Sequence, residues 1–261
     1  MKVVIAIPAR NSEKTIGAVY HDIPAHYQNH VLMSDDGSTD ATARVAQKLG
    51  IKVFRNPRQP GYGSNVKNCF IQALKLGADI VIILHSDNQY DATKIPQLVA
   101  PIENNQADFT IGSRILGDRA QGMSAFRFIG NRFLGLMENL IMGTKITDLH
   151  SGLIAVRADV LKVIPFRIDS DDYGFHTDVV LQSHYVGARF KEVGIPTRYE
   201  DVSTSISIYK SIIYGFSTLW TLLKYACNRS RIIRSPQFIM RGRLKTQQSQ
   251  ALKDQSGSRK Q

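Results

Sequence analysis

The sequence predicts an α/β fold with an open, mostly parallel β-sheet and helices on both of its faces. Two observations indicate this class. Short apolar runs alternate with longer helix-like segments through roughly the first 115 of the 261 residues. In the run DIVIIL at 79–84, every residue after Asp79 is apolar, as in a strand buried on both faces. No internal repeat interrupts the alternation.

The expected elements follow one another in a regular order. The expected strands are KVVIAI at 2–7, HVLMS at 30–34, IKVF at 51–54, DIVIIL at 79–84 and ADFTIG at 107–112. The expected helices between them are 12–23, 41–49, 63–76 and 92–103. Ser12 is a candidate N-cap for the first helix, and Gly50 and Gly77 are expected to end the second and third.

Charge and cysteine content exclude several classes of protein. The net charge is +11, but ten basic residues and one acidic residue lie from Lys224 onward. The preceding part is therefore nearly neutral, and a nucleic-acid partner is not expected. Cys69 and Cys227 have neither metal-ligand spacing nor the number needed for a disulfide framework. The N-terminal apolar run is too short for a secretory signal, so a cytoplasmic location is expected.

Polar segments follow several of the expected strands. These segments are PARNSE at 8–13, SDDGSTD at 34–40, HSDNQYD at 85–91 and GSR at 112–114. In open α/β sheets, ligands bind beyond the carboxyl ends of the strands. Four such segments at one edge of the sheet therefore predict a binding site there.

Two of these segments allow both a structural and a functional interpretation. SDDGSTD fits an Asx-turn in which Ser38 or Asp40 caps a helix, or a carboxylate that binds a ribose or base. If HSDNQYD is extended, then His85, Asp87 and Gln89 lie on one side and could hold a divalent cation between two phosphates. The alternative is a polar turn in which Asp91 caps the next helix.

Six motifs stand out along the chain, namely IPARNSEKTI, SDDGSTDAT, PGYGSNVKNCF, HSDNQYDATKIPQL, ADFTIGSR and TDLHSGLIAVRADVL. Together they resemble the family 2 glycosyltransferases, most closely the branch that includes dolichol-phosphate mannose synthase. They occur in that family's order and spacing over residues 2 to 207. The resemblance implies a GT-A fold, a nucleotide-diphospho-sugar donor, a divalent metal (Mn²⁺ or Mg²⁺) and transfer with inversion.

The resemblance also assigns residues to the donor and metal sites. The nucleotide-sugar-binding positions that it implies are Pro8, Arg10, Ser12, Ser34, Asp36, Ser86, Asp87 and Arg114. The implied metal-binding positions are His85, Asp87 and Gln89. His85 stands where the family has an acid, and Ile154 stands where it usually has an arginine. The segment 196–207 lacks the glycine and lysine typical of polyprenyl-phosphate enzymes, although Arg198 and Lys210 are close in sequence.

The acceptor side is less defined by the sequence. Asp178, at the start of an expected helix, is the candidate general base for a hydroxyl acceptor, and the alternative is a carboxylate that stabilises the helix N-terminus. A phosphate acceptor would need no base. Asp148, His150 and His176 are placed in the acceptor region, and the acceptor is expected to be a polyprenyl phosphate or a glycan hydroxyl.

The C-terminal part has a different character. Residues 211–227 are rich in apolar and aromatic side chains, and the basic segment follows directly. We expect an amphipathic helix on an anionic membrane surface, which places the protein peripherally on the cytoplasmic face; the alternative is a helix packed on the domain. The expected organisation is a nucleotide-sugar-binding half (1–115), an acceptor-binding half (116–205), a helix with a basic segment (206–245) and a disordered tail (246–261).

The sequence thus predicts a metal-dependent, inverting glycosyltransferase. One alternative is a nucleotide-sugar-binding protein impaired in catalysis, as His85 and Ile154 would suggest. A second is a nucleotidyltransferase, which would release pyrophosphate instead of a nucleoside diphosphate. A nicotinamide-dependent reductase is disfavoured because no G-x-G-x-x-G follows the first strand.

Overall fold

The computed structural model describes residues 1–58, 60–116, 124–198, 208–239 and 244. Its seven-stranded sheet has the order β3-β2-β1-β4-β6-β5-β7. The strands are β1 (Val3–Ala9), β2 (Val31–Asp35), β3 (Lys52–Arg55), β4 (Ile80–Ile83), β5 (Phe109–Ser113), β6 (Ile154–Arg157) and β7 (Phe190–Gly194). Only β6 runs antiparallel to its neighbours, β4 and β5. The predicted open, mostly parallel sheet is confirmed.

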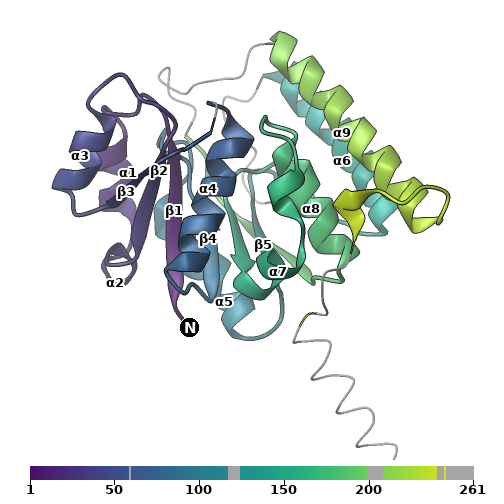
Figure 1. Ribbon diagram of the computed structural model, residues 1–261, viewed down its shortest axis with the longest axis horizontal. Helices are drawn as coiled ribbons and strands as arrows, with labels where there is room; N and C mark the ends of the chain where they lie inside the picture. Colours follow the sequence, from purple (N-terminus) through teal and green to yellow (C-terminus); the bar gives the residue numbers. More distant parts are fainter. Residues whose placement is uncertain (59, 117–123, 199–207, 240–243, 245–261) are drawn as a thin grey trace, which may run out of the picture.

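Helices cover both faces of this sheet (Figure 1). They are α1 (Ile16–Asp22), α2 (Ala25–Gln28), α3 (Thr42–Lys48), α4 (Tyr62–Lys75), α5 (Ile95–Glu103), α6 (Ala125–Met142), α7 (Ala158–Val163), α8 (Phe175–Tyr185) and α9 (Ile208–Arg229). One hydrophobic cluster joins the sheet to α4, α7, α8 and the inner side of α9. A second cluster joins the opposite face to α1, α3 and α5.

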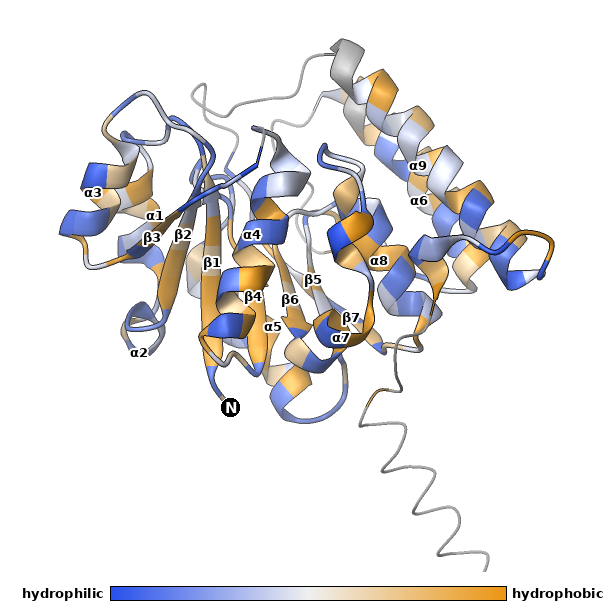
Figure 2. Ribbon diagram, viewed as in Figure 1, coloured by the Kyte–Doolittle hydropathy of each residue, from blue (hydrophilic) through white to orange (hydrophobic). Residues whose placement is uncertain are grey.

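Burial explains the continuous apolar strands of the sequence. Every residue of β1, β2, β4 and β5 is buried. Figure 2 shows these strands as hydrophobic ribbons between layers of helices. Gly50 and Gly77 have φ values of +79° and +73°, which suit a glycine directly after a helix. Their predicted role in ending α3 and α4 is confirmed.

The predicted N-cap role of Ser12 is wrong. Helix α1 begins at Ile16, with Thr15 at the N-cap position. The Ser12 hydroxyl, in the segment after β1, instead forms a 2.8 Å hydrogen bond with the hydroxyl of Ser86, in the segment after β4. The capping alternative for Asp91 is met, since it occupies the N-cap position of the 3₁₀ helix Ala92–Lys94 and accepts the Thr93 N–H at 3.0 Å. Asp40 accepts the Thr42 N–H at 2.9 Å, but the N-cap position of α3 is Ala41.

Helices α6 and α9 pack against each other beside the sheet layers (Figure 1). The apolar segment expected at 211–227 forms part of α9, which extends from Ile208 to Arg229. Within the described ranges, no helix has both the length and the hydropathy of a transmembrane span. The tail predicted at 246–261 lies outside the described residues.

Candidate active site

A cavity of about 980 Å³ lies at the carboxyl ends of the central strands and continues to the surface between α6 and α9. Most of the residues predicted to bind donor, metal or acceptor line it. These are Pro8, Arg10, Ser12, Asp36, His85, Ser86, Asp87, Gln89, Arg114, His150 and His176. Three others, Ser34, Asp148 and Asp178, do not line it. The hydroxyl of Ser34 accepts a hydrogen bond from Asn68 at 2.8 Å beneath the cavity.

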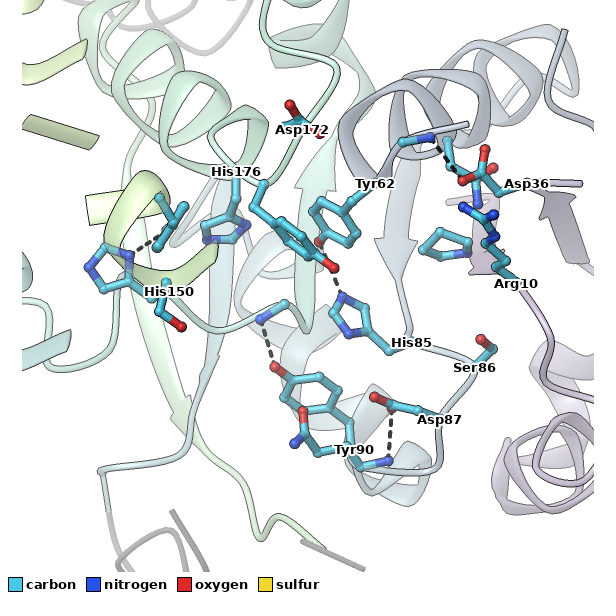
Figure 3. A pocket seen from close by; sticks show the side chains of 18 of the residues that line it. Arg10, Asp36, Tyr62, His85, Ser86, Asp87, Tyr90, His150, Asp172 and His176 are labelled. Carbon is cyan, nitrogen blue, oxygen red and sulfur yellow. Dashed lines mark hydrogen bonds between the residues drawn. The ribbon is translucent and has the colours of Figure 1, made fainter. Parts of the chain in front are cut away.

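The carboxylate of Asp36 is fixed at the β2 end of the cavity. It accepts the Gly61 N–H at 2.9 Å and the Asn56 side-chain amide at 2.7 Å. Burial raises the pKa of Asp36, although these two donors and nearby Arg10 act in the opposite direction. Figure 3 shows Asp36 and Arg10 on the same side of the cavity. A carboxylate acceptor beside a guanidinium can bind the hydroxyls of a ribose and an adjacent phosphate.

The segment that follows β4 is a turn, so its predicted extended form is wrong. Residues 86–88 bend, and Asn88 has a φ of +59°. The Asp87 carboxylate accepts the Gln89 N–H at 3.1 Å across this turn. All three predicted ligands, His85, Asp87 and Gln89, nevertheless line the cavity, because the turn itself faces it.

The imidazole of His85 is enclosed by aromatic rings (Figure 3). Its Nε2 lies 3.2 Å from the Tyr62 hydroxyl, and its ring centroid is 5.3 Å from that of Tyr90. Gly152 provides the necessary space, since a Cβ there would lie 2.4 Å from the imidazole. Burial lowers the pKa of His85, while Asp87 acts to raise it. The ring is therefore neutral near pH 7, with Nε2 directed to Tyr62.

The donor set fits a divalent cation that is completed by a substrate. Among the described residues, no three His, Cys, Asp or Glu side chains form a ready-made metal cage. Mg²⁺ and similar cations are commonly held by one or two carboxylates, water and the phosphates of a substrate. Asp87, with Gln89 beside it on the cavity wall, would supply the carboxylate of such a site. His85 is a weaker candidate for a metal ligand, because its Nε2 already contacts the Tyr62 hydroxyl.

Arg114 is held in the cavity by the buried carboxylate of Asp148. Two parallel contacts join them, with Nε 2.7 Å and Nη2 2.9 Å from the Asp148 oxygens. The Arg114 backbone N–H also donates to Asp148 at 3.0 Å. Burial would raise the pKa of Asp148, but Arg114 outweighs burial and lowers it. Asp148, predicted in the acceptor region, therefore acts by orienting Arg114.

Two histidines in the acceptor region have opposite charge states. His176 Nε2 lies 2.8 Å from the Leu149 carbonyl oxygen, and burial lowers its pKa to about 4. His150 lies between Glu138 of α6 and Tyr214 of α9. Burial lowers the pKa of His150, but Glu138 and Tyr214 outweigh burial and raise it to about 10. At neutral pH, His176 is therefore uncharged and His150 is an imidazolium.

The structure does not bring Asp178 to the cavity. Asp178 lies two residues after cavity-lining His176 on α8. Side chains two positions apart on an α-helix point to nearly opposite sides, so Asp178 faces away from the cavity. Its carboxylate accepts the Ser170 N–H at 3.1 Å and the Thr221 hydroxyl at 3.0 Å. The Thr221 contact joins α8 to α9, and the Ser170 contact joins α8 to the segment that precedes it. The geometry therefore favours the structural alternative for Asp178, a packing role away from the chemistry.

Sequence reasoning missed the apolar half of the cavity. This half comprises Phe126, Phe133 and Leu134 of α6 and Ile212, Phe216 and Leu219 of α9. Tyr62, Tyr90, Tyr173 and Tyr214 were also missed as lining residues. A periodicity could have revealed α6, because Phe126, Ile129, Phe133, Leu136 and Leu140 recur at three- and four-residue intervals.

The open, mostly parallel α/β sheet with polar groups at its strand ends has the architecture of the GT-A fold. Residues 4–164 match the model of the Glycosyl transferase family 2, and the chain belongs to this family of glycosyltransferases.

Two relatives and one solved structure illustrate the similarity. The chain is 25% identical to the UDP-N-acetylglucosamine–dolichyl-phosphate N-acetylglucosaminyltransferase of Methanococcus voltae, covering 85% of this chain and 94% of that one. It is 28% identical to the undecaprenyl-phosphate mannosyltransferase of Micrococcus luteus, covering 75% and 83%. Glucosyl-3-phosphoglycerate synthase from Mycobacterium tuberculosis, solved with Mn²⁺ and UDP, superposes with a TM-score of 0.70 at 18% identity, covering 86% and 80%. This last likeness concerns the fold.

Proposed function

We propose that this glycosyltransferase moves a sugar, with inversion, from a nucleoside-diphosphate donor to a polyprenyl phosphate at a membrane surface. The observation that carries this proposal is the shape of the cavity. Its inner end lies at polar strand ends, and its outer end lies between the apolar side chains of α6 and α9. Such a cavity suits a hydrophilic donor and an acceptor whose head is polar and whose tail is apolar.

At the donor end, charged groups match the parts of a nucleoside-diphosphate sugar. In this proposal Asp36 and Arg10 bind the nucleoside, and Arg114, held by Asp148, contacts the diphosphate. Asp87, with Gln89, would hold a divalent metal there. The bound cation would supply positive charge that stabilises the leaving nucleoside diphosphate. Arg114 assists because its guanidinium keeps a fixed orientation through Asp148.

At the acceptor end, the described lining favours a phosphate over a sugar hydroxyl. The polar side chains nearest the α6/α9 end are Asn131, His150, His176, Ser211 and Tyr214, none of which is a carboxylate. Asp178 points away, and Asp172, which also lines the cavity, is the carboxylate that a hydroxyl acceptor would require as its base. A phosphate oxygen is already anionic, so it can attack the anomeric carbon as the bond to the leaving diphosphate breaks. The two relatives with named acceptors use polyprenyl phosphates.

The outer surface of α6 and α9 would rest on the membrane. The exposed apolar side chains of this α6/α9 surface are Phe126, Phe128, Ile129, Phe133, Leu136 and Leu140 of α6, with Ile212, Ile213, Phe216, Leu219, Trp220 and Leu223 of α9. Figure 2 shows the two helices with mixed apolar and polar ribbon at the side of the molecule. Exposed Arg229, Arg231 and Arg234 follow at the end of α9. Apolar and cationic groups together match an anionic leaflet.

The test of the transfer reaction uses full-length protein, Mn²⁺, a panel of nucleotide-sugars and vesicles containing undecaprenyl phosphate. We expect a glycosylated lipid phosphate and release of a nucleoside diphosphate. Vesicles with undecaprenol, which lacks the phosphate, serve as the matched control and should give no product. Pyrophosphate release would indicate a nucleotidyltransferase, and donor binding without transfer would indicate a protein impaired in catalysis.

Membrane binding is tested by vesicle sedimentation. The variant Leu136→Ser/Trp220→Ser changes two exposed side chains of the α6/α9 surface that do not line the cavity. We expect it to bind anionic vesicles more weakly than the wild type does, with unchanged donor binding. Ile168→Ser, at an exposed apolar position elsewhere, is the control. Equal sedimentation of all three proteins would contradict the proposed surface.

A further inference from the structure

A buried polar unit connects α6 and α9 to the loop that precedes β6. It consists of Glu138 on α6, His150 in the loop and Tyr214 on α9. His150 Nε2 lies 3.2 Å from the Glu138 carboxylate, and its Nδ1 lies 2.7 Å from the Tyr214 hydroxyl. The side chains of Glu138 and His150 are 1% and 4% exposed. Each buried charge is stable there because the other compensates it.

The protonation of His150 determines how the Tyr214 hydroxyl is used. An imidazolium has two N–H donors, so one faces Glu138 and the other donates to the Tyr214 oxygen. Two other titratable groups influence this region, Asp148 of the same loop and His176 of α8. Since the Tyr214 oxygen accepts from His150, its own proton is available to donate. The Thr177 hydroxyl, at 3.4 Å, is a long and weak partner for it.

Tyr214 and His150 line the outer end of the cavity, where the polar lining meets the apolar side chains of α6 and α9. The phosphate of a polyprenyl phosphate would stop at this boundary, because its tail belongs with the apolar groups and its head belongs with the donor. A hydroxyl that accepts from an imidazolium is polarised and becomes a stronger donor to an anion.

We propose that Glu138, His150 and Tyr214 form an acceptor-phosphate subsite in which the Tyr214 hydroxyl donates a hydrogen bond to a phosphate oxygen. Tyr214 contacts the acceptor, whereas Glu138 and His150 position it. The inference rests on the proposed function and adds a structural consequence. Because α6 and α9 each contribute one member, the subsite is complete only when both helices of the α6/α9 surface are in place.

The first test is Tyr214→Phe, which removes only the hydroxyl. We expect kcat/KM for undecaprenyl phosphate to fall roughly 10- to 100-fold, as for the loss of one hydrogen bond to a charged group. Donor affinity should stay near that of the wild type, while the melting temperature should fall because a buried N–H of His150 loses its acceptor. Tyr185→Phe is the matched control, because its hydroxyl contacts Asn228 of α9 at 3.0 Å but does not line the cavity. The control should transfer sugar as the wild type does.

The second test separates positioning from packing. In wild-type protein, ¹⁵N NMR of the imidazole should show His150 protonated through about pH 8, and in Glu138→Gln its pKa should fall to 6.5 or below, because burial then acts without the opposing carboxylate. In that variant, kcat/KM for the lipid phosphate should decline as the pH rises through this range. If Glu138 and His150 only stabilised the fold, the pH dependence of kcat/KM in Glu138→Gln would not follow the NMR titration of His150.

The outcomes distinguish this inference from the proposed function. If the wild type transfers sugar to undecaprenyl phosphate and Tyr214→Phe does so equally well, the subsite is refuted and the acceptor class stands. A His150 ring that is neutral at pH 7 in the wild type would also refute it. If the wild type uses no polyprenyl phosphate, the proposed acceptor fails and the subsite fails with it.

Discussion

The buried carboxyl of Asp169 should make the stability of this protein decrease as the pH rises. Asp169 is 6% exposed and lies near Asp178, and its carboxyl accepts hydrogen bonds from Gln182 at 2.7 Å and Gln237 at 3.1 Å. Burial and the neighbouring Asp178 raise its pKa from 3.8 to about 7. The folded state therefore retains a proton that the unfolded chain loses near pH 4. The unfolding free energy consequently decreases as the pH rises from about 4 to 7.

The size of the effect follows from the raised pKa. Each pKa unit corresponds to 1.36 kcal/mol, so the wild type should lose about 3 kcal/mol of unfolding free energy between about pH 4.5 and 8 through this group. Asp169→Asn resembles the protonated carboxyl and cannot ionise. Compared with the wild type, the variant should therefore gain about 3 kcal/mol over the same range, from about pH 4.5 to 8, in urea denaturation.

The matched control for this experiment is Asp159→Asn. Asp159 forms a surface pair with Lys162 at 3.1 Å, and surface pairs of this kind contribute little to stability. Its difference from the wild type should be small and nearly constant with pH. A constant difference for Asp169→Asn as well would refute the reasoning, because it would mean that Asp169 is ionised in the folded protein at low pH.

Two further predictions concern the cavity and the core. Asp87→Ala should reduce Mn²⁺-dependent transfer by roughly 100-fold or more, equivalent to about 3 kcal/mol, because the carboxylate of the metal site is lost; activity that persists in excess chelator would contradict this. Asp178→Asn should leave kcat within roughly two-fold while lowering the unfolding free energy by about 1–2 kcal/mol, since one core hydrogen bond fails. A 10²- to 10⁴-fold lower kcat, measured at saturating donor, would restore the general-base role.

The sequence could predict the sheet and the inner end of the cavity for physical reasons. A strand buried on both faces is expected to be continuously apolar, as Ile80–Ile83 is. The polar segments that follow such strands meet at one edge, so Arg10, Asp36, Asp87 and Arg114 line one cavity although they are far apart in the chain. Both inferences need only local patterns and one topological rule.

The outer end of the cavity could not be predicted in the same way. Helix α6 lies against α9, about 80 residues later in sequence, and their shared surface depends on tertiary packing. Strand β6 pairs antiparallel with β4 and β5, which no periodicity indicates. Asp178 illustrates a related limit, because its place at the start of an expected helix does not specify which side of that helix faces the cavity.

The two departures from the family pattern have different structural meanings. Ile154 lies in β6, is 3% exposed and packs in the core, so it does not leave a gap in the cavity wall. His85 lines the cavity, and it is accommodated by Gly152, Tyr62 and Tyr90. The replacement of an acid by His85 therefore comes with a supporting environment that keeps the ring neutral. A site adapted around its unusual residue, with the Arg114–Asp148 pair intact, favours an active enzyme over one decaying after loss of catalysis.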